Sequence, residues 1–463
     1  MHLSPFVVLI GWIPLGTYLF RRYPARIAIL LNFFGGWAIL PGANYIATPD
    51  IFPYWIVGVC LPTDYFLTKA TATGIAALAG TLLFHRTELK RFQPGICDLP
   101  MAIWCCVPLL SAAAHWSTLQ ENLIGAVYQT VAWGVPWLLG RTYFSDRDSQ
   151  LLGARALVAA AICYVPLCFV EICFGPQIYA FLYGYQPYRW VGAERYLGFR
   201  PVGLMEDGNQ LGIWMAAATL IAVSLALQRS TKSILGLPMG WVAGGLGSTT
   251  LLCQSAGSIL LLLILLPLTL LKRRSVMRAS VAILIVGILA LVLFRMTNLV
   301  SLRALAKSNE AVRSFAVELA SIGRESFGWR LARDESHIAA ALQRPLLGSG
   351  RWNWWEEGSD SRPWSLWLLI FGMYGLIGLV AFGFILFVPI YRAAWSTATK
   401  HEADALDLRL ALVALILMIA IDSLLNGSMI LPYLVVMGGV ASRDARLIAR
   451  ANSYQIIGYR GSR

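Results

Sequence analysis

Residues 364–391 decide the fold class and read Trp364-Ser-Leu-Trp-Leu-Leu-Ile-Phe-Gly-Met-Tyr-Gly-Leu-Ile-Gly-Leu-Val-Ala-Phe-Gly-Phe-Ile-Leu-Phe-Val-Pro-Ile-Tyr391. The stretch contains no Asp, Glu, Lys or Arg. Because an α-helix rises about 1.5 Å per residue, about 20 apolar residues span the roughly 30 Å hydrocarbon core of a bilayer. This pattern therefore predicts a membrane-spanning helix.

Similar apolar runs recur along the whole chain. They fall near 5–20, 27–46, 66–84, 101–115, 123–140, 151–173, 209–227, 236–252, 256–271, 279–295, 408–427 and 429–441. The sequence is 58% hydrophobic and 13% charged, whereas roughly a quarter of the residues in soluble domains are charged. We therefore expect an all-α integral membrane protein with about 12–13 transmembrane helices. Residues 1–463 are predicted to form a single polytopic membrane domain.

Basic residues mark every second connection between these runs. They are Arg21, Arg22, Arg26, Arg86, Lys90, Arg91, Arg141, Arg147, Lys272, Arg273, Arg274 and Arg278, and Arg443, Arg446 and Arg450 follow the last run. Cytoplasmic loops of membrane proteins carry such an excess of Lys and Arg. The net charge of +13 is therefore interpreted as a sign of membrane orientation and not of nucleic-acid binding. The N-terminus is predicted outside and the C-terminus inside.

The same alternation places the long, aromatic-rich connections on the outer face of the membrane. These outer loops are residues 41–65, 174–208 and 296–363, of which the last is the largest. The sequence lacks the Gly-rich phosphate loop with its Lys that is typical of nucleotide-binding proteins, and we predict neither a cofactor nor a metal. Chemistry at an outward-facing site would therefore need a substrate that is already activated on a lipid.

Arginine and aromatic side chains alternate in the loop 174–208. Trp190 and Tyr196 are suited to stack on sugar rings, while the guanidinium groups of Arg195 and Arg200 are suited to phosphate oxygens. An aromatic belt at the lipid headgroups is the alternative interpretation. Asn209 stands at the start of the next helix, where it either contacts a substrate or caps the helix.

The large outer loop supplies two more arginines, Arg324 and Arg330, and a histidine, His337. Of the five histidines in the chain, His337 is a plausible proton acceptor on the outer face, because imidazole titrates near neutral pH. A structural histidine, and arginines paired with Glu325 or Asp334, remain the alternatives.

Three stretches together resemble the superfamily of O-antigen ligases and O-antigen polymerases, which are bacterial envelope glycosyltransferases. They are Arg200-Pro-Val-Gly203 with Asn209, then Gln254-Ser-Ala-Gly257, and then the segment from Arg330 through Pro345-Leu-Leu-Gly-Ser-Gly350 to Gly378. The resemblance covers roughly residues 195–395. It implies a fold like that of the C-type glycosyltransferases in the bacterial inner membrane, with the active face toward the periplasm.

The resemblance also implies an activity. Such enzymes take a glycan from undecaprenyl diphosphate and join it to a glycan or lipid acceptor, without a metal or a nucleotide, beside other polysaccharide-assembly proteins. Arg200 and Arg330 match the arginines that would hold the diphosphate, with Arg195 and Arg324 as further candidates, and Trp190, Tyr196 and Asn209 would contact the sugar. Ligases carry His-Asn where this chain has Trp364-Ser365. His337 or Glu206 is therefore the expected catalytic base.

Two other classes of function remain open. A transporter or flippase for an envelope glycan or lipid would show inverted repeats with helices broken at matching places, and no convincing internal repeat is found in the sequence. A noncatalytic envelope-assembly protein would retain the helices but would not need clustered arginines on its outer face. The lipid-linked glycan polymerase or ligase is the preferred hypothesis.

Overall fold

The computed structural model describes residues 2–42, 66–90, 92–114, 119–185, 194–271, 273–297, 310, 314, 325–355, 362–395, 403–427 and 429–442. Within these residues the protein is mostly helical, and each of the predicted apolar runs contains a helix. The expectation of a mostly helical chain is confirmed.

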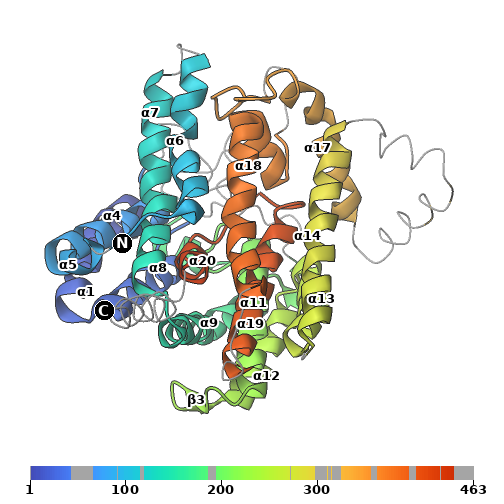
Figure 1. Ribbon diagram of the computed structural model, residues 1–463. Helices are drawn as coiled ribbons and strands as arrows, with labels where there is room; N and C mark the ends of the chain where they lie inside the picture. The colour runs from blue at the N-terminus through green and yellow to red at the C-terminus, as the bar shows by residue number, and fades with distance from the viewer. Residues whose placement is uncertain are drawn as a thin grey trace, which may run out of the picture.

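Figure 1 shows how the helices are arranged. The first part contains α1 (Pro5–Arg22), α2 (Ala25–Leu30), the π-helix η1 (Leu31–Gly35), α3 (Gly36–Ile39), α4 (Lys69–Phe84), α5 (Arg86–Leu89), the short helix η4 (Ile96–Asp98), α6 (Leu99–Ala114), α7 (Leu119–Gln129), the π-helix η6 (Thr130–Gly134), α8 (Val135–Tyr143), α9 (Arg147–Phe174) and α10 (Ile178–Tyr183). The second part contains α11 (Gly208–Leu227), α12 (Met239–Leu252), α13 (Ala256–Leu265), the short helix η7 (Pro267–Leu270), α14 (Arg274–Thr297), α17 (Glu325–Ala341), α18 (Leu366–Trp395), α19 (Ala403–Asp422) and α20 (Tyr433–Ala441).

Five helical segments of the described chain are long and apolar enough to cross a membrane. They are Leu119–Tyr143, Arg147–Phe174, Gly208–Leu227, Arg274–Thr297 and Leu366–Trp395. Four further apolar segments, Ala25–Ile39, Lys69–Phe84, Ile96–Ala112 and Ala256–Leu270, are shorter. The protein therefore has the helices of a membrane protein, and the number of 12–13 spans stays a prediction.

The helices differ in how much of their surface the bundle covers. In the most apolar stretch of α11, 83% is buried inside the protein, whereas in that of α14 only 17% is buried. Helix α19 packs against α11, α13 and α18, and its residues from Leu410 to Met418 are buried. Because α11 and α19 lie at the centre, side chains at their ends are surrounded by protein. Helix α14 presents its apolar side chains outward, as expected where lipid covers the surface.

Two short antiparallel hairpins interrupt the helical order. Strands β1 (Glu194–Arg195) and β2 (Gly198–Phe199) lie within the predicted outer loop 174–208, together with α10. Strands β3 (Ser233–Ile234) and β4 (Leu237–Pro238) connect α11 with α12. Figure 1 shows the β3 hairpin at the lower end of the bundle and α17 at the upper end. The two ends of the bundle therefore carry different structures.

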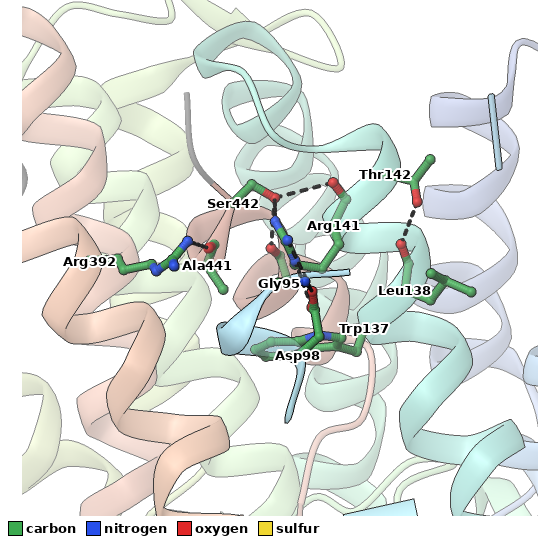
Figure 2. Close-up of polar contacts among 10 residues, drawn as sticks. Gly95, Asp98, Trp137, Leu138, Arg141, Thr142, Arg392, Ala441 and Ser442 are labelled. Atoms are coloured by element: carbon green, nitrogen blue, oxygen red, sulfur yellow. Dashed lines mark hydrogen bonds and ion pairs between the residues drawn. The ribbon is translucent and has the colours of Figure 1, made fainter. Parts of the chain in front are cut away.

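A polar clamp around Asp98 joins helix ends that the sequence predicts in the cytoplasm. The Asp98 carboxylate accepts hydrogen bonds from Nε1 of Trp137 (2.9 Å), from Nε of Arg141 (2.8 Å) and from the backbone N–H of Gly95 (2.8 Å). Figure 2 shows that Arg141 also reaches Ser442, to which its Nη1 donates at 2.8 Å. The clamp thus connects the start of α6 with the ends of α8 and α20. Both oxygens of the Asp98 carboxylate accept hydrogen bonds, as expected for a structural ion pair.

Helix α18 is broken at Gly375, whose backbone has a φ of 63° and a ψ of −160°. The segment 345–350 lies against the break and replaces the missing helical hydrogen bonds. Leu376 N donates to Pro345 O at 2.7 Å, and Ser349 N donates to Gly372 O at 2.9 Å. Irregular backbone at membrane depth is tolerated only where the protein satisfies it in this way. The sequence predicted a continuous helix here, and this break was not foreseen.

We predict that Gly375→Ala destabilises the protein. A Cβ at Gly375 would overlap the backbone carbonyl of Leu346, and the positive φ alone costs about 1–3 kcal/mol for a residue other than glycine. The matched control is Gly383→Ala in the same helix, where a Cβ would lie 3.8 Å from Phe387. Thermal unfolding in detergent measures the difference. Equal melting temperatures of the two variants would contradict this description of the break.

Candidate functional site

The turn between β2 and α11 is held by buried acceptors on α9. The Glu171 carboxylate accepts hydrogen bonds from the backbone N–H groups of Val202 (2.7 Å) and Gly203 (2.6 Å), and the Tyr164 hydroxyl accepts one from Leu204 N (2.5 Å). Gly203 has a φ of 60°, and a Cβ there would overlap the Tyr164 hydroxyl. These contacts explain the glycine of the Arg200-Pro-Val-Gly203 stretch, and they fix the position of Arg200.

A buried ion pair holds the same turn from the other side. Nζ of Lys69, the first residue of α4, lies 3.0 Å from Oε1 of Glu206, and both side chains are fully buried. Lys69 also donates to Leu204 O at 3.2 Å and lies over the Trp37 ring at 4.3 Å. Burial raises the pKa of Glu206 to about 7, while the charge of Lys69 acts in the opposite direction. The structure therefore places Glu206 inside the bundle, where it anchors the turn.

Asp207 begins α11 and organises the polar groups around Arg200. Its Oδ1 accepts from Gln210 N at 2.7 Å, which is an N-cap, and its Oδ2 accepts from Nδ2 of Asn209 at 3.1 Å. The Asn209 side chain in turn accepts a hydrogen bond of 2.7 Å from Nη2 of Arg200, and the same nitrogen lies 3.2 Å from Oγ of Ser255 at the start of α13. The structure thus brings together Arg200 and Asn209, two of the predicted site residues.

Arg330 approaches this group from α17. Its Nη1 donates to Oδ1 of Asn426 at 2.6 Å, and its guanidinium lies 5.3 Å from the centroid of the Trp364 ring. Nδ2 of Asn426 donates to Oδ1 of Asp422 at 2.6 Å. The ring of Trp364 packs against Arg330 and fixes the orientation of the guanidinium.

The charges of these groups act on one another, which places them in one cluster. Burial lowers the pKa of Arg200 to about 10; Asp207 opposes this change, and Arg195 and Arg330 add to it. Burial also lowers the pKa of Arg330, and Asp207 and Asp422 oppose that change. We refer to Arg195, Arg200 and Arg330 as the arginine cluster. It is assembled from the β1 hairpin, the turn before α11, and α17.

Each member of the arginine cluster has an unused donor. The Nε atoms of Arg195, Arg200 and Arg330 are buried and form no hydrogen bond with the described part of the chain. A buried donor without a partner costs about 1–3 kcal/mol, and more when it is charged. A ligand with several anionic oxygens would compensate the charge of these groups, and guanidinium binds phosphate through two parallel hydrogen bonds. The cluster is therefore suited to a diphosphate.

Three predicted site residues lie apart from these contacts or outside the described residues. Tyr196 lies at the tip of the β1–β2 hairpin and is 85% exposed. Its ring is available for stacking, but nothing in the described chain aims it toward the cluster. Trp190 and Arg324 lie outside the described residues. Their predicted roles in sugar and diphosphate binding stay predictions.

His337 shares one face of α17 with Arg330 and Asp334. Its Nδ1 lies 2.8 Å from Arg333 O, and its ring meets the Trp354 ring edge to face at 6.3 Å. Asp334 accepts hydrogen bonds from the backbone N–H groups of Trp364 (2.6 Å) and Ser365 (3.3 Å). These contacts attach α17 to the start of α18. The structure places the buried His337 two turns beyond Arg330, beside Trp354.

The sequence assigned no role to four residues that the structure places in or beside the cluster. They are Lys69, Ser255, Asp422 and Asn426. The spacing of Asp422 and Asn426, four residues apart at the end of an apolar run, is the signal that was available. Ionisable groups inside membrane helices are rare, and by default they suggest a functional site.

An apolar groove lies beside the cluster. It has a volume of about 340 Å³ and is lined by α14, α18 and α19, with Val292, Met296, Trp367, Phe387 and Leu424 among its walls. Leu424 lies between Asp422 and Asn426 in the chain. The chain segment that holds Arg330 through Asn426 therefore also contributes to the wall of the groove, and two of the lining helices, α14 and α18, are long and apolar enough to cross a membrane.

No protein-family model matches the chain, and no curated protein and no solved structure matches it either. The argument about function therefore depends on the residues themselves.

We predict that Lys69→Met destabilises the protein by about 3–5 kcal/mol, because it leaves the buried carboxylate of Glu206 without a countercharge. The double variant Lys69→Met with Glu206→Gln removes both charges and should recover much of this loss. Thermal unfolding of the purified variants in detergent measures both effects. Equal stability of the single and double variants would contradict the role of this pair as an anchor of the turn.

Proposed function

We propose that the protein transfers or polymerises a glycan carried on undecaprenyl diphosphate, at the outer face of the bacterial inner membrane. The observation that carries the proposal is the arginine cluster, in which three partly exposed arginines have buried Nε donors without a partner in the described chain. Positive charge in a membrane protein is expensive and calls for an anionic partner. A lipid-linked diphosphate would satisfy the donors and would also explain the apolar groove.

In this reaction an acceptor hydroxyl attacks the anomeric carbon of the donor glycan. The bond from that carbon to the diphosphate oxygen breaks, and the electron pair leaves with the diphosphate. Arg200 and Arg330 stabilise the negative charge that develops on the leaving group, as preorganised donors do in other group-transfer enzymes. Asn209 sets the position of Arg200 by a direct hydrogen bond. Asp422 sets the position of Arg330 through Asn426, which is hydrogen-bonded to both.

The groove between α14, α18 and α19 suits the polyprenyl tail. Its described walls are almost entirely apolar, so a hydrocarbon tail can pack against them by van der Waals contact, as it would against other lipid tails in the bilayer. The diphosphate would then lie at the arginine cluster, at the end of the bundle that carries α17. The metal-independent glycosyltransferase reaction of a C-type enzyme is consistent with this arrangement.

The start of α18 bears on the choice between polymerase and ligase. Trp364 packs against Arg330, and the backbone N–H of Ser365 is bonded to Asp334. Both positions therefore support Arg330, where a ligase would carry its His-Asn pair. This favours a polymerase-like role for an O-antigen or exopolysaccharide, with a ligase-like role as the alternative.

A broken helix such as α18 is also found in transporters, where half-helix ends bind the cargo near the middle of the membrane. Here the segment 345–350 lies in the break and forms hydrogen bonds with the backbone groups of α18 that the break leaves without a helical partner. The ends of the two halves are thus used by the protein itself. The break therefore gives little support to a transporter or flippase for an envelope glycan or lipid.

Arg200→Ala and Arg330→Ala should each lower glycan transfer by about 10²–10³-fold, since each removes a donor that stabilises the leaving group. The measurement is the size distribution of glycan that membranes form from a lipid-linked donor. The matched control is Arg26→Ala, which breaks the exposed ion pair with Asp146 and should leave the distribution unchanged.

Normal chain length with both arginine variants would overturn the proposal and would favour a noncatalytic role in envelope assembly. Loss of glycan export without a change in chain length would favour the transporter.

A further inference from the structure

Five carboxylates surround the arginine cluster, and the structure shows which of them have free oxygens. Glu171 accepts three backbone N–H groups, Asp207 caps α11 and bonds to Asn209, and Asp334 binds Trp364, Ser365 and Arg295. Glu206 faces Lys69 and is completely buried. The Oε2 of Glu206 also receives no hydrogen bond from the described chain, but that side chain is fully buried. Of the five, Asp422 combines an oxygen without a donor in the described chain, Oδ2, with some exposed surface.

We propose that Asp422 is the group that accepts the proton from the attacking hydroxyl. This inference rests on the proposed function and adds to it a base that the sequence did not identify. The attacking oxygen forms its bond to the anomeric carbon while its proton passes to Oδ2 of Asp422, and the diphosphate leaves with the electron pair of the broken C–O bond. Charge and atoms balance without a metal or a further reactant.

The position of Asp422 supports this role. It stands at the last residue of α19 and is 8% exposed, so that the protein covers most of it and leaves a small accessible part. Asn426 bridges its Oδ1 to Arg330 with two hydrogen bonds of 2.6 Å. The bridge keeps the carboxylate beside the guanidinium without a direct ion pair, which would take up both oxygens. A base within hydrogen-bond reach of the reacting group is what general base catalysis requires.

The two bases expected from the sequence are less well placed. Glu206 has no exposed surface and lies against Lys69, so an acceptor hydroxyl cannot reach it in this structure. His337 is 1% exposed, and its Nδ1 is directed to the carbonyl of Arg333 in its own helix. Asp422 combines partial access, an oxygen without a donor in the described chain, and a link to Arg330 through Asn426.

The test uses the full-length protein and a lipid-linked glycan donor. Asp422→Asn retains the shape of the side chain and should lower the rate of transfer about 10²–10⁴-fold, the usual range for loss of a general base. Binding of the donor should change little, because the asparagine side chain retains an oxygen that accepts the hydrogen bond of Asn426, which keeps Arg330 in place. The control is Ser224→Ala, near the end of α11 opposite to Asp207, since Ser224 Oγ donates to Leu220 O within its own helix, and it should retain full activity.

Chemical rescue distinguishes a base from a structural residue. Asp422→Ala removes the side chain and leaves space for a small carboxylic acid, so added formate should restore activity at least about 10-fold in this variant. It should not do so in Asp422→Asn or in Arg330→Ala. A structural role for Asp422 would give no rescue. If Asp422→Asn does not accumulate in the membrane, rescue of Asp422→Ala alone decides.

The outcomes separate this inference from the proposed function. Full activity of Asp422→Asn, or absence of formate rescue, would overturn the role of Asp422 while wild-type transfer still supports the glycosyltransferase. Loss of activity in His337→Asn by the same factor, with Asp422→Asn unaffected, would assign the base to His337 instead. No transfer by the wild-type protein would contradict the proposed function itself.

Discussion

The cost of burying charge in a helical bundle that carries membrane-spanning segments determines how this structure is organised. Charged groups inside it are stable only when paired or hydrogen-bonded, and the described acids and bases meet this requirement in distinct ways. Asp98 with Arg141 joins helix ends at one side, and Lys69 with Glu206 fixes the turn before α11 at the other. The Nε atoms of the arginine cluster are buried and form no hydrogen bond with the described chain, and an anionic ligand is the simplest compensation for their shared positive charge.

The scaffold that positions the cluster also depends on backbone hydrogen bonds. The break at Gly375 admits the segment 345–350 into α18, and α17 reaches the same region directly before that segment. Asp334 attaches α17 to the start of α18 through the backbone of Trp364 and Ser365. Arg330 is therefore held by Trp364 before α18 and by Asn426 after α19, while Arg200 is held by α9, α11 and α13. The two arginines approach each other because these supports meet at one end of the bundle.

The sequence predicted the helices well because apolar composition is a local property. It also predicted the neighbourhood of Arg200 and Asn209, which are separated by only nine positions. The contact of Arg330 with Asn426 spans 96 positions, and no pattern in a single sequence indicates such a contact. The break in α18 was missed because glycine also occurs in continuous membrane helices. Asp422 was visible as an ionisable residue near a helix end, but its neighbours only appear once the chain has folded.

The central claim is that the arginine cluster binds the diphosphate of a lipid. The most direct test is calorimetric titration of the purified protein with geranylgeranyl diphosphate and, separately, with geranylgeraniol. The account predicts saturable binding of the diphosphate that weakens about 10–100-fold in Arg200→Ala and in Arg330→Ala, in line with hydrogen bonds to charged groups worth about 1.5–3 kcal/mol. Equal binding of the alcohol, or binding of the diphosphate that neither substitution changes, would contradict it.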